Sequence, residues 1–199
     1  MMLAVVALAV SGPATCPRVS SKVEQLICND EQLRRFDAAL MAIVRTAPSK
    51  RVEYRRWLVQ RNKCAARSCL VDTYETRLLD AISEGTTGAR HYRSRPNDGD
   101  LDILALGGGW FVFSVVGKWA TGNGSWNFAE QGGSFRLDAK GIAVNKPADE
   151  DDCGWKVERL AGDRWRVSTI TSKPISGFEC YGLNATIDGT YSSSQRKSQ

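Results

Sequence analysis

Histidine is nearly absent from this sequence, which has one, His91, among 199 residues. A zinc site built from several histidines, or a Ser-His-Asp mechanism, would depend on that single side chain. His91 lies in a Gly- and Arg-rich segment, where a solvated loop residue is expected. The nucleophile elbow, the metalloprotease helix, the phosphate loop and the dinucleotide fingerprint are also missing. We therefore predict a protein that is not an enzyme and that uses neither a metal nor a cofactor.

Long apolar runs are missing as well. A membrane-spanning helix needs about 20 apolar residues. The longest run lies within MMLAVVALAVSGPAT, over residues 1–15, and is too short for that. This segment is typical of the apolar and cleavage regions of a secretory signal, although the basic start of a signal is missing. The sequence thus predicts export, to a periplasmic or secreted location in the bacterial cell envelope, without a transmembrane segment.

Cysteine is present in an even number, six, which in an exported chain favours disulfides. Cys64 and Cys69 lack the CxxC spacing of a redox pair, and the shortage of histidine disfavours zinc. The net charge is +5, and the basic excess lies between Cys16 and Ser83. Export argues against nucleic acid as the partner of these basic residues, so an anionic envelope surface fits better.

Two amphipathic helices are expected in this basic part of the chain. Apolar residues recur at helical spacing from Leu33 to Ala47, and Pro48 ends the pattern. A second helical pattern runs from near Ser49 to Ile82. The short turn between the two predicts antiparallel neighbours.

This hairpin suggests a disulfide pairing. Cys28 and Cys69 lie about 20 residues on either side of the turn, so they are level with each other at the open end. That geometry favours a Cys28–Cys69 bridge and leaves Cys16 to pair with Cys64. The alternative, Cys16–Cys28 with Cys64–Cys69, remains open. Either pairing would contribute a large share of the stability of so small a unit.

Strand-like patterns dominate after a Gly-, Arg- and Asp-rich linker at residues 85–100. Runs of β-branched and aromatic residues alternate with turns such as DAKG and LAGDR, and Cys153 and Cys180 are a natural pair within them. The predicted fold class is α+β. A disulfide-stapled antiparallel helical hairpin at 16–84 is followed by a small antiparallel β barrel or sandwich at 101–192. Residues 193–199 are expected to form a disordered tail.

The helical part carries a family resemblance. Its residues are VEQLIC up to Cys28, then Asp30, Leu33 and Asp37, then WLVQRNKC up to Cys64, and finally CLVDTYETRL from Cys69. This order resembles the LprI-type domain of bacterial envelope proteins, named for a mycobacterial lysozyme inhibitor. The resemblance covers residues 16–82, with a departure at Asn62, where the family often has Asp. It implies a secreted or periplasmic helical domain with two disulfides and, more weakly, lysozyme inhibition.

The residue types within this motif indicate structural roles. Trp57 and Tyr74 lie at core spacing on the second helical pattern. Arg61 and Arg77 lie on or beside the same face, and a half-buried arginine needs an acceptor. Asp37 on the first helix is the candidate acceptor for either one. A structural ion pair is therefore expected here rather than a binding site.

An acidic run, Asp149, Glu150, Asp151 and Asp152, directly precedes Cys153. Four consecutive acids fit the alternating ligands of a calcium site poorly. The plain interpretation is a solvated hairpin loop. The functional interpretation is a partner-binding loop that contacts a basic enzyme such as a lysozyme, because complementary charge steers encounter.

Together these features favour an exported cell-envelope protein that binds and inhibits a lysozyme-like muramidase. One alternative is a non-catalytic envelope binding or scaffolding module that contacts an anionic surface or a partner protein. A further alternative is an immunity protein against a wall-degrading toxin.

Overall fold

The fold divides into two compact units, Met1–Tyr74 and Glu75–Gln199. A computed structural model describes residues 21–85, 87–94, 99–120, 125–146, 153–171, 178–181 and 185–194. The signal-like segment at 1–15 therefore lies outside the described residues. The division falls inside a helix, ahead of residue 84, where the sequence predicts the end of the helical part.

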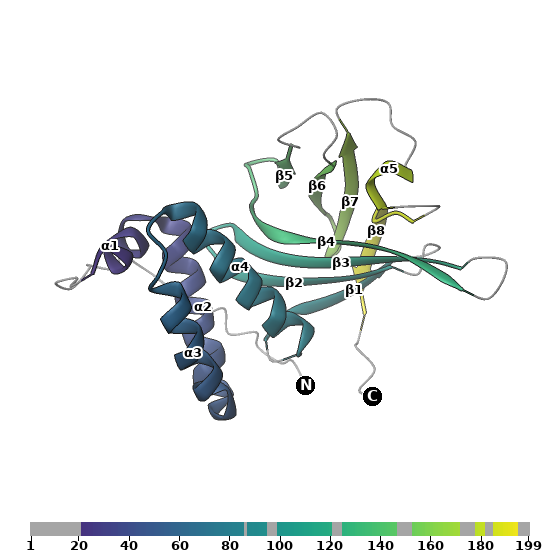
Figure 1. The fold of residues 1–199 in the computed structure, drawn as a ribbon. Helices are drawn as coiled ribbons and strands as arrows, with labels where there is room; N and C mark the ends of the chain where they lie inside the picture. The colour runs from purple at the N-terminus through teal and green to yellow at the C-terminus, as the bar shows by residue number, and fades with distance from the viewer. Residues whose placement is uncertain are drawn as a thin grey trace, which may run out of the picture. The chain divides into compact units, whose positions relative to one another are not determined.

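Helices make up the described part of the first unit (Figure 1). They are α1 (Lys22–Asn29), α2 (Glu31–Thr46), the 3-10 turn η1 (Pro48–Lys50), α3 (Arg51–Arg61) and the first half of α4 (Arg67–Ser83). Ser21 caps α1, since its hydroxyl accepts the Glu24 N–H at 3.2 Å. Asp30 caps α2 in the same way through the Leu33 N–H at 3.0 Å.

The predicted second helix is two helices, so the expectation of one continuous helix from Ser49 to Ile82 is wrong. A turn at residues 62–66 separates α3 from α4. The cause is the disulfide between Cys64 and Cys69, whose Cα atoms are 5.5 Å apart. Residues five apart in a straight helix rise about 7.5 Å along its axis and face different sides, which is too far for this bond.

The core of the helical unit is small. Leu33, Phe36 and Leu40 of α2 are buried, and so are Leu70 and Tyr74 of α4. The Tyr74 ring lies 5.9 Å from the Phe36 ring, centroid to centroid, and 5.0 Å from the ring of Trp57 on α3. These aromatic contacts tie the three helices together.

The second unit is built on one antiparallel sheet of eight strands, in the order β4-β3-β2-β1-β8-β7-β6-β5. The strands are β1 (Arg90–Ser94), β2 (Asp100–Gly107), β3 (Trp110–Ala120), β4 (Trp126–Arg136), β5 (Ile142–Asn145), β6 (Cys153–Leu160), β7 (Arg164–Thr171) and β8 (Gly189–Ser193), with a short helix α5 (Phe178–Tyr181) before the last. Consecutive strands pair except β4 and β5, which are the two ends of the order, and β8 pairs with β1. The sheet is thus a nearly closed, barrel-like meander, which fits the predicted α+β class.

A single core fills the inside of this sheet, and all eight strands contribute to it. Phe113, Phe135, Trp155 and Trp165 form its aromatic centre, with edge-on ring contacts such as 4.8 Å between Phe113 and Trp155. Gly117 has no room for a side chain, because a Cβ there would collide with the Thr186 carbonyl. The backbone around Thr186 therefore crosses closely over β3.

The segment predicted to be a linker, 85–100, contains β1, so that prediction is wrong over residues 90–94. The alternation of the strand is hidden in the sequence because its outward residues are charged. Tyr92 and Ser94 point inward and are buried. The predicted tail begins two residues too early, since Ser193 ends β8 and the Ser194 N–H donates to the His91 carbonyl. Residues 195–199 lie outside the described part.

Candidate functional site

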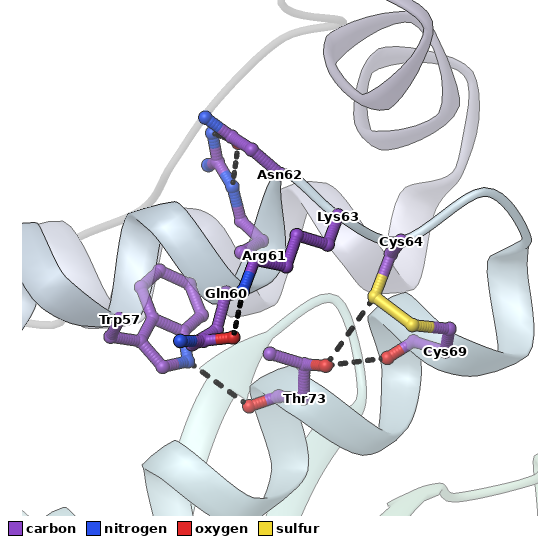
Figure 2. Close-up of a disulfide and its surroundings, with 8 residues drawn as sticks. All are labelled: Trp57, Gln60, Arg61, Asn62, Lys63, Cys64, Cys69 and Thr73. Carbon is purple, nitrogen blue, oxygen red and sulfur yellow. Dashed lines mark hydrogen bonds between the residues drawn. A yellow bond between two sulfur atoms is a disulfide. The ribbon is translucent and has the colours of Figure 1, made fainter.

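The turn between α3 and α4 carries the two cysteines of the resemblance motif (Figure 2). Cys64 and Cys69 are bonded to each other, so the favoured pairing of Cys69 with Cys28, and of Cys64 with Cys16, is wrong. The pairing by height along a hairpin fails because the helix breaks between the two cysteines. Cys28 is itself disulfide-bonded, and Cys16 lies outside the described residues. The Cys64–Cys69 half of the alternative pairing is confirmed.

Thr73 fixes this disulfide to α4. Its hydroxyl donates to the Cys69 carbonyl at 2.7 Å and lies 3.5 Å from the Cys64 sulfur. The indole N–H of Trp57 on α3 donates to the Thr73 carbonyl at 3.3 Å, as Figure 2 shows. The disulfide therefore staples the turn after α3 to α4. Among the described residues, no group of His, Cys, Asp or Glu is arranged to hold a metal ion.

Arg61, Asp37 and Tyr74 form a buried polar network beside the disulfide. The Arg61 Nη1 lies 3.3 Å from Asp37 Oδ1 and donates to the Tyr74 hydroxyl at 3.2 Å. The Tyr74 hydroxyl donates to the same Asp37 oxygen at 2.7 Å. Burial, and then the nearby Asp37 charge, raise the pKa of Tyr74 far above its usual value. The predicted structural ion pair between Asp37 and Arg61 is confirmed.

Asn62 completes this network from the other side. Its Oδ1 accepts from Arg61 Nε at 3.1 Å and from Nη2 at 2.8 Å. One amide oxygen thus accepts from two nitrogens of the guanidinium. Asn62 supplies these hydrogen bonds without adding a negative charge. With acceptors on both sides, Arg61 has a structural role.

Arg77 does not reach Asp37, so that part of the prediction is wrong. Its guanidinium lies 4.0 Å from Asp80 and 3.9 Å from Glu84. The reason is its position three residues after Tyr74, about one turn further along α4. Residue spacing alone placed both arginines near one face, while only Arg61 has Asp37 in reach.

Asp30 links the start of α2 to the start of α4. Besides capping α2, it accepts from Arg67 Nε at 2.6 Å, and Arg67 also donates to Gln32 at 2.7 Å. Partial burial raises the pKa of Asp30, but the bonds from the Leu33 N–H and Arg67 outweigh it and leave that pKa below its usual value. Asp30, Asp37, Trp57, Arg61 and Tyr74 of the motif thus hold the helical unit together.

The acidic run, Asp149, Glu150, Asp151 and Asp152, lies outside the described residues. Its anchor is described: Cys153 at the start of β6 is bonded to Cys180 in α5, which confirms that predicted pair. The partner-binding role of the run stays a prediction.

His91 is a strand residue that is largely buried, so the expectation of a solvated loop residue is wrong. Its Nδ1 lies 3.0 Å from Asp102, and its Nε2 lies 3.4 Å from Asp100. Asp100 also accepts from Lys118 at 2.9 Å and from Arg93 at 3.1 Å. Both ring nitrogens therefore face carboxylates, in a charge network on the outer face of β1, β2 and β3.

The end of the β3–β4 hairpin carries large apolar side chains in solvent. Trp119, Trp126 and Phe128 are 43%, 50% and 53% exposed. The last pair between β2 and β3 is Asp100 with Val116, while β3 and β4 stay paired as far as Ala120 and Trp126. Figure 1 shows these ends extending past the neighbouring strands. We call Trp119, Trp126 and Phe128 the aromatic hairpin end.

These three residues were missed in the sequence because aromatic residues in a strand are usually core. Their position in the sequence could have indicated that they are exposed. Trp126 and Phe128 alternate with the buried Ala129, and the Gly-rich sequence TGNGS stands directly before them. Trp126 and Phe128 lie on one face of the strand pair, and Trp119, which pairs with Asn127, lies on the other. Exposed apolar surface is typical of interaction sites.

A second exposed surface lies on the helical unit. Arg45 at the end of α2, and Arg51, Arg55 and Arg56 on α3, have no ion pair with any described residue. Other basic residues nearby are engaged: Lys50 lies 3.3 Å from Glu53. The basic excess of this unit is therefore concentrated on one segment.

Comparison with known proteins assigns neither a family nor a function to the chain. No family model, no curated protein and no solved structure matches the chain. The resemblance to the LprI-type domain is thus neither supported nor refuted by them. Within the described residues, none of the helices combines the length and apolarity needed to cross a membrane.

Proposed function

We propose that the chain is an exported cell-envelope protein, periplasmic or secreted, that binds and inhibits a lysozyme-like muramidase without catalysing a reaction. The starting point is the LprI-type motif of the helical unit. Two further observations support export: the Cys64–Cys69 disulfide and the Cys153–Cys180 disulfide. Disulfides of this kind persist in oxidising compartments.

The observation that carries the proposal is the aromatic hairpin end. Exposed tryptophan supplies much of the binding energy in protein interfaces. Lysozymes are basic enzymes, so an inhibitor surface should lack basic residues. From Trp119 to Gln131 the sequence has one charged residue, Glu130, which is acidic. The basic residue next to them, Lys118, is paired with Phe128 across the strands and donates to Asp100 at 2.9 Å. A narrow two-stranded hairpin of this composition suits the substrate groove of such an enzyme.

The acidic run from Asp149 to Asp152 is proposed as a second contact. Four acids beside a disulfide would attract a cationic enzyme and speed the encounter. This contact should depend strongly on salt, whereas the aromatic contact should depend on it little. The two contributions can therefore be separated by ionic strength.

The test is a lysis assay. Peptidoglycan lysis by several muramidases is followed at increasing concentrations of the oxidised protein. We expect inhibition at micromolar protein, and the loss of inhibition at low salt when Asp149, Asp151 and Asp152 are changed to Asn and Glu150 to Gln. Absence of inhibition against every muramidase would end this proposal. Including wall-degrading toxins in the panel distinguishes an immunity protein, which would inhibit its own toxin alone.

A second candidate function is an envelope binding module on an anionic surface. The specific observation in its favour is the set of four arginines, at 45, 51, 55 and 56, without an ion pair among the described residues. Such a cluster attracts anionic polymers or headgroups. It would also repel a basic enzyme, so muramidase binding and surface binding would use different faces.

A further inference from the structure

One side of α3 combines cationic and apolar side chains in solvent. Val52, Arg55, Arg56 and Val59 follow the spacing i, i+3, i+4, i+7, which places them on one side of the helix. The opposite side carries Tyr54, Trp57 and Arg61, which face the interior of the unit. We call Val52, Arg55, Arg56 and Val59 the outer face of α3.

The two valines of this face are unusually exposed. Val52 is 60% exposed and Val59 is 59% exposed, and they are among the large hydrophobic residues that the described part leaves in solvent. They flank the two arginines, one turn to either side. An exposed valine gains from burial against apolar groups, but it gains nothing from a hydrated polymer.

The charge of this face is not compensated locally. The one acid of α3, Glu53, lies 3.3 Å from Lys50. Arg51 adds a third cation beside the face, and Arg45 of α2 adds a fourth near the same turn. Cations gathered on one side of a helix raise the local concentration of anions.

We propose that the outer face of α3 binds anionic lipid headgroups at a bilayer surface. The arginines would contact the phosphates, and Val52 and Val59 would enter the boundary between headgroups and acyl chains. Helices that lie on a membrane show this combination of basic and apolar residues. The proposal rests on the second candidate function, and it commits to lipid because the valines discriminate against a soluble polyanion.

The expected strength follows from the number of cations. Each basic side chain near an anionic bilayer strengthens binding about fivefold. Removing Arg55 and Arg56 should therefore weaken binding about 25-fold. Two valines bury little apolar area, so binding is expected to be reversible and to weaken steeply with salt.

The test is co-sedimentation of the full oxidised protein with phosphatidylcholine vesicles, with and without phosphatidylglycerol. Three variants are compared with the wild type: R55Q/R56Q, V52N/V59N and the control K140Q/K146Q. The control removes the same charge from exposed lysines of the β unit. Circular dichroism confirms that each variant is folded. A parallel titration with soluble polyphosphate provides the polyanion arm.

We expect binding to the phosphatidylglycerol vesicles alone, a loss of about 25-fold in R55Q/R56Q, a severalfold loss in V52N/V59N and none in the control. If V52N/V59N binds vesicles like the wild type, the lipid assignment is overturned while anionic binding stands. If the wild type binds neither vesicles nor polyphosphate, the second candidate function fails as well. Equal losses in R55Q/R56Q and the control would place the contact outside α3.

Discussion

Arg61 in the helical unit and Trp155 in the β unit are buried to a similar extent, at 8% and 3% exposed, but their neighbours differ. Arg61 is held by four hydrogen bonds to Asp37, Asn62 and Tyr74. Trp155 is held by the edges and faces of Phe113 and Phe135. Arg61 is thus held by directional contacts, whereas Trp155 is held by apolar burial.

This difference explains why the resemblance motif says little about binding. The charged and aromatic residues of the motif are used to build the helical unit. The surfaces open to a partner are the aromatic hairpin end, which lies outside the motif, and the outer face of α3, which shares Val59 with it. Four changes can break or sharpen the comparison.

The largest effect is expected from W155A. Removing the indole leaves a cavity between Phe113 and Phe135, and such changes cost about 3–5 kcal/mol. Urea unfolding followed by tryptophan fluorescence and circular dichroism measures the loss. The matched control is V144A, an exposed apolar residue of β5, which should change stability by about 0.5 kcal/mol at most. Equal effects of the two changes would mean that the barrel core is not packed as described.

The two disulfides should differ in how much each one stabilises its unit. Cys153–Cys180 spans 27 residues and Cys64–Cys69 spans 5. Closing the longer loop removes more entropy from the unfolded chain, about 3.5 kcal/mol against about 2 kcal/mol. C153A/C180A should therefore destabilise the β unit more than C64A/C69A destabilises the helical unit, measured by thermal unfolding. The reverse order would show that the short staple acts mainly through the native contacts of Thr73.

Loss of Arg61 should cost about 2–3 kcal/mol, because R61A removes the positive charge beside Asp37, which keeps the Tyr74 hydroxyl as a donor, and removes the donor to the Tyr74 hydroxyl. R61K should recover part of this, since lysine keeps the charge but not the fork. The control is R56A, a surface change expected to be close to neutral. A double-mutant cycle with D37A isolates the energy of the Arg61–Asp37 pair. A coupling energy near zero would show that this pair does not stabilise the fold.

The smallest expected effect is the change in stability at acidic pH. The lowered pKa of Asp30 means that its contribution to stability is present above its usual pKa and is lost as pH falls through the lowered value. Asp100 is the counterpart in the β unit. Burial raises its pKa, but bonds from Lys118 and Arg93 outweigh this and lower it.

D30A should cost about 1 kcal/mol at neutral pH, because it removes a helix cap, and D30N should cost less because asparagine also caps. As pH falls through the lowered pKa of Asp30, the carboxylate becomes protonated, and wild type and D30N should converge in unfolding free energy. The unfolding free energies of wild type and D100N should likewise converge at acidic pH. Parallel pH curves for wild type and variants would contradict the assigned bonds.

The α+β class could be predicted from the sequence because it depends on composition and periodicity. Helical spacing from Leu33 to Ala47 and the strand-like runs after residue 100 reflect local burial. The break between α3 and α4 could not be predicted in this way, since the apolar spacing on each side of it is helical. The choice between disulfide pairings depends on that break.

The candidate sites show the same limit. Asp37 and Arg61 could be matched because charge and spacing favour them, but excluding Arg77 needs the position of α4. The sequence predicts a linker in place of strand β1 because the outward residues of this strand are charged. The exposure of Trp126 and Phe128 depends on where β2 stops pairing, which is a tertiary property that no local pattern records.

The central claim, that the aromatic hairpin end inhibits a lysozyme-like muramidase, is tested most directly by the lysis assay with W126A/F128A. We expect at least a tenfold loss of inhibition, since exposed aromatic anchors at an interface are worth about 2 kcal/mol or more. V144A, which removes an exposed apolar group elsewhere on the sheet, should inhibit like the wild type. Inhibition by W126A/F128A that equals the wild type would contradict the claim.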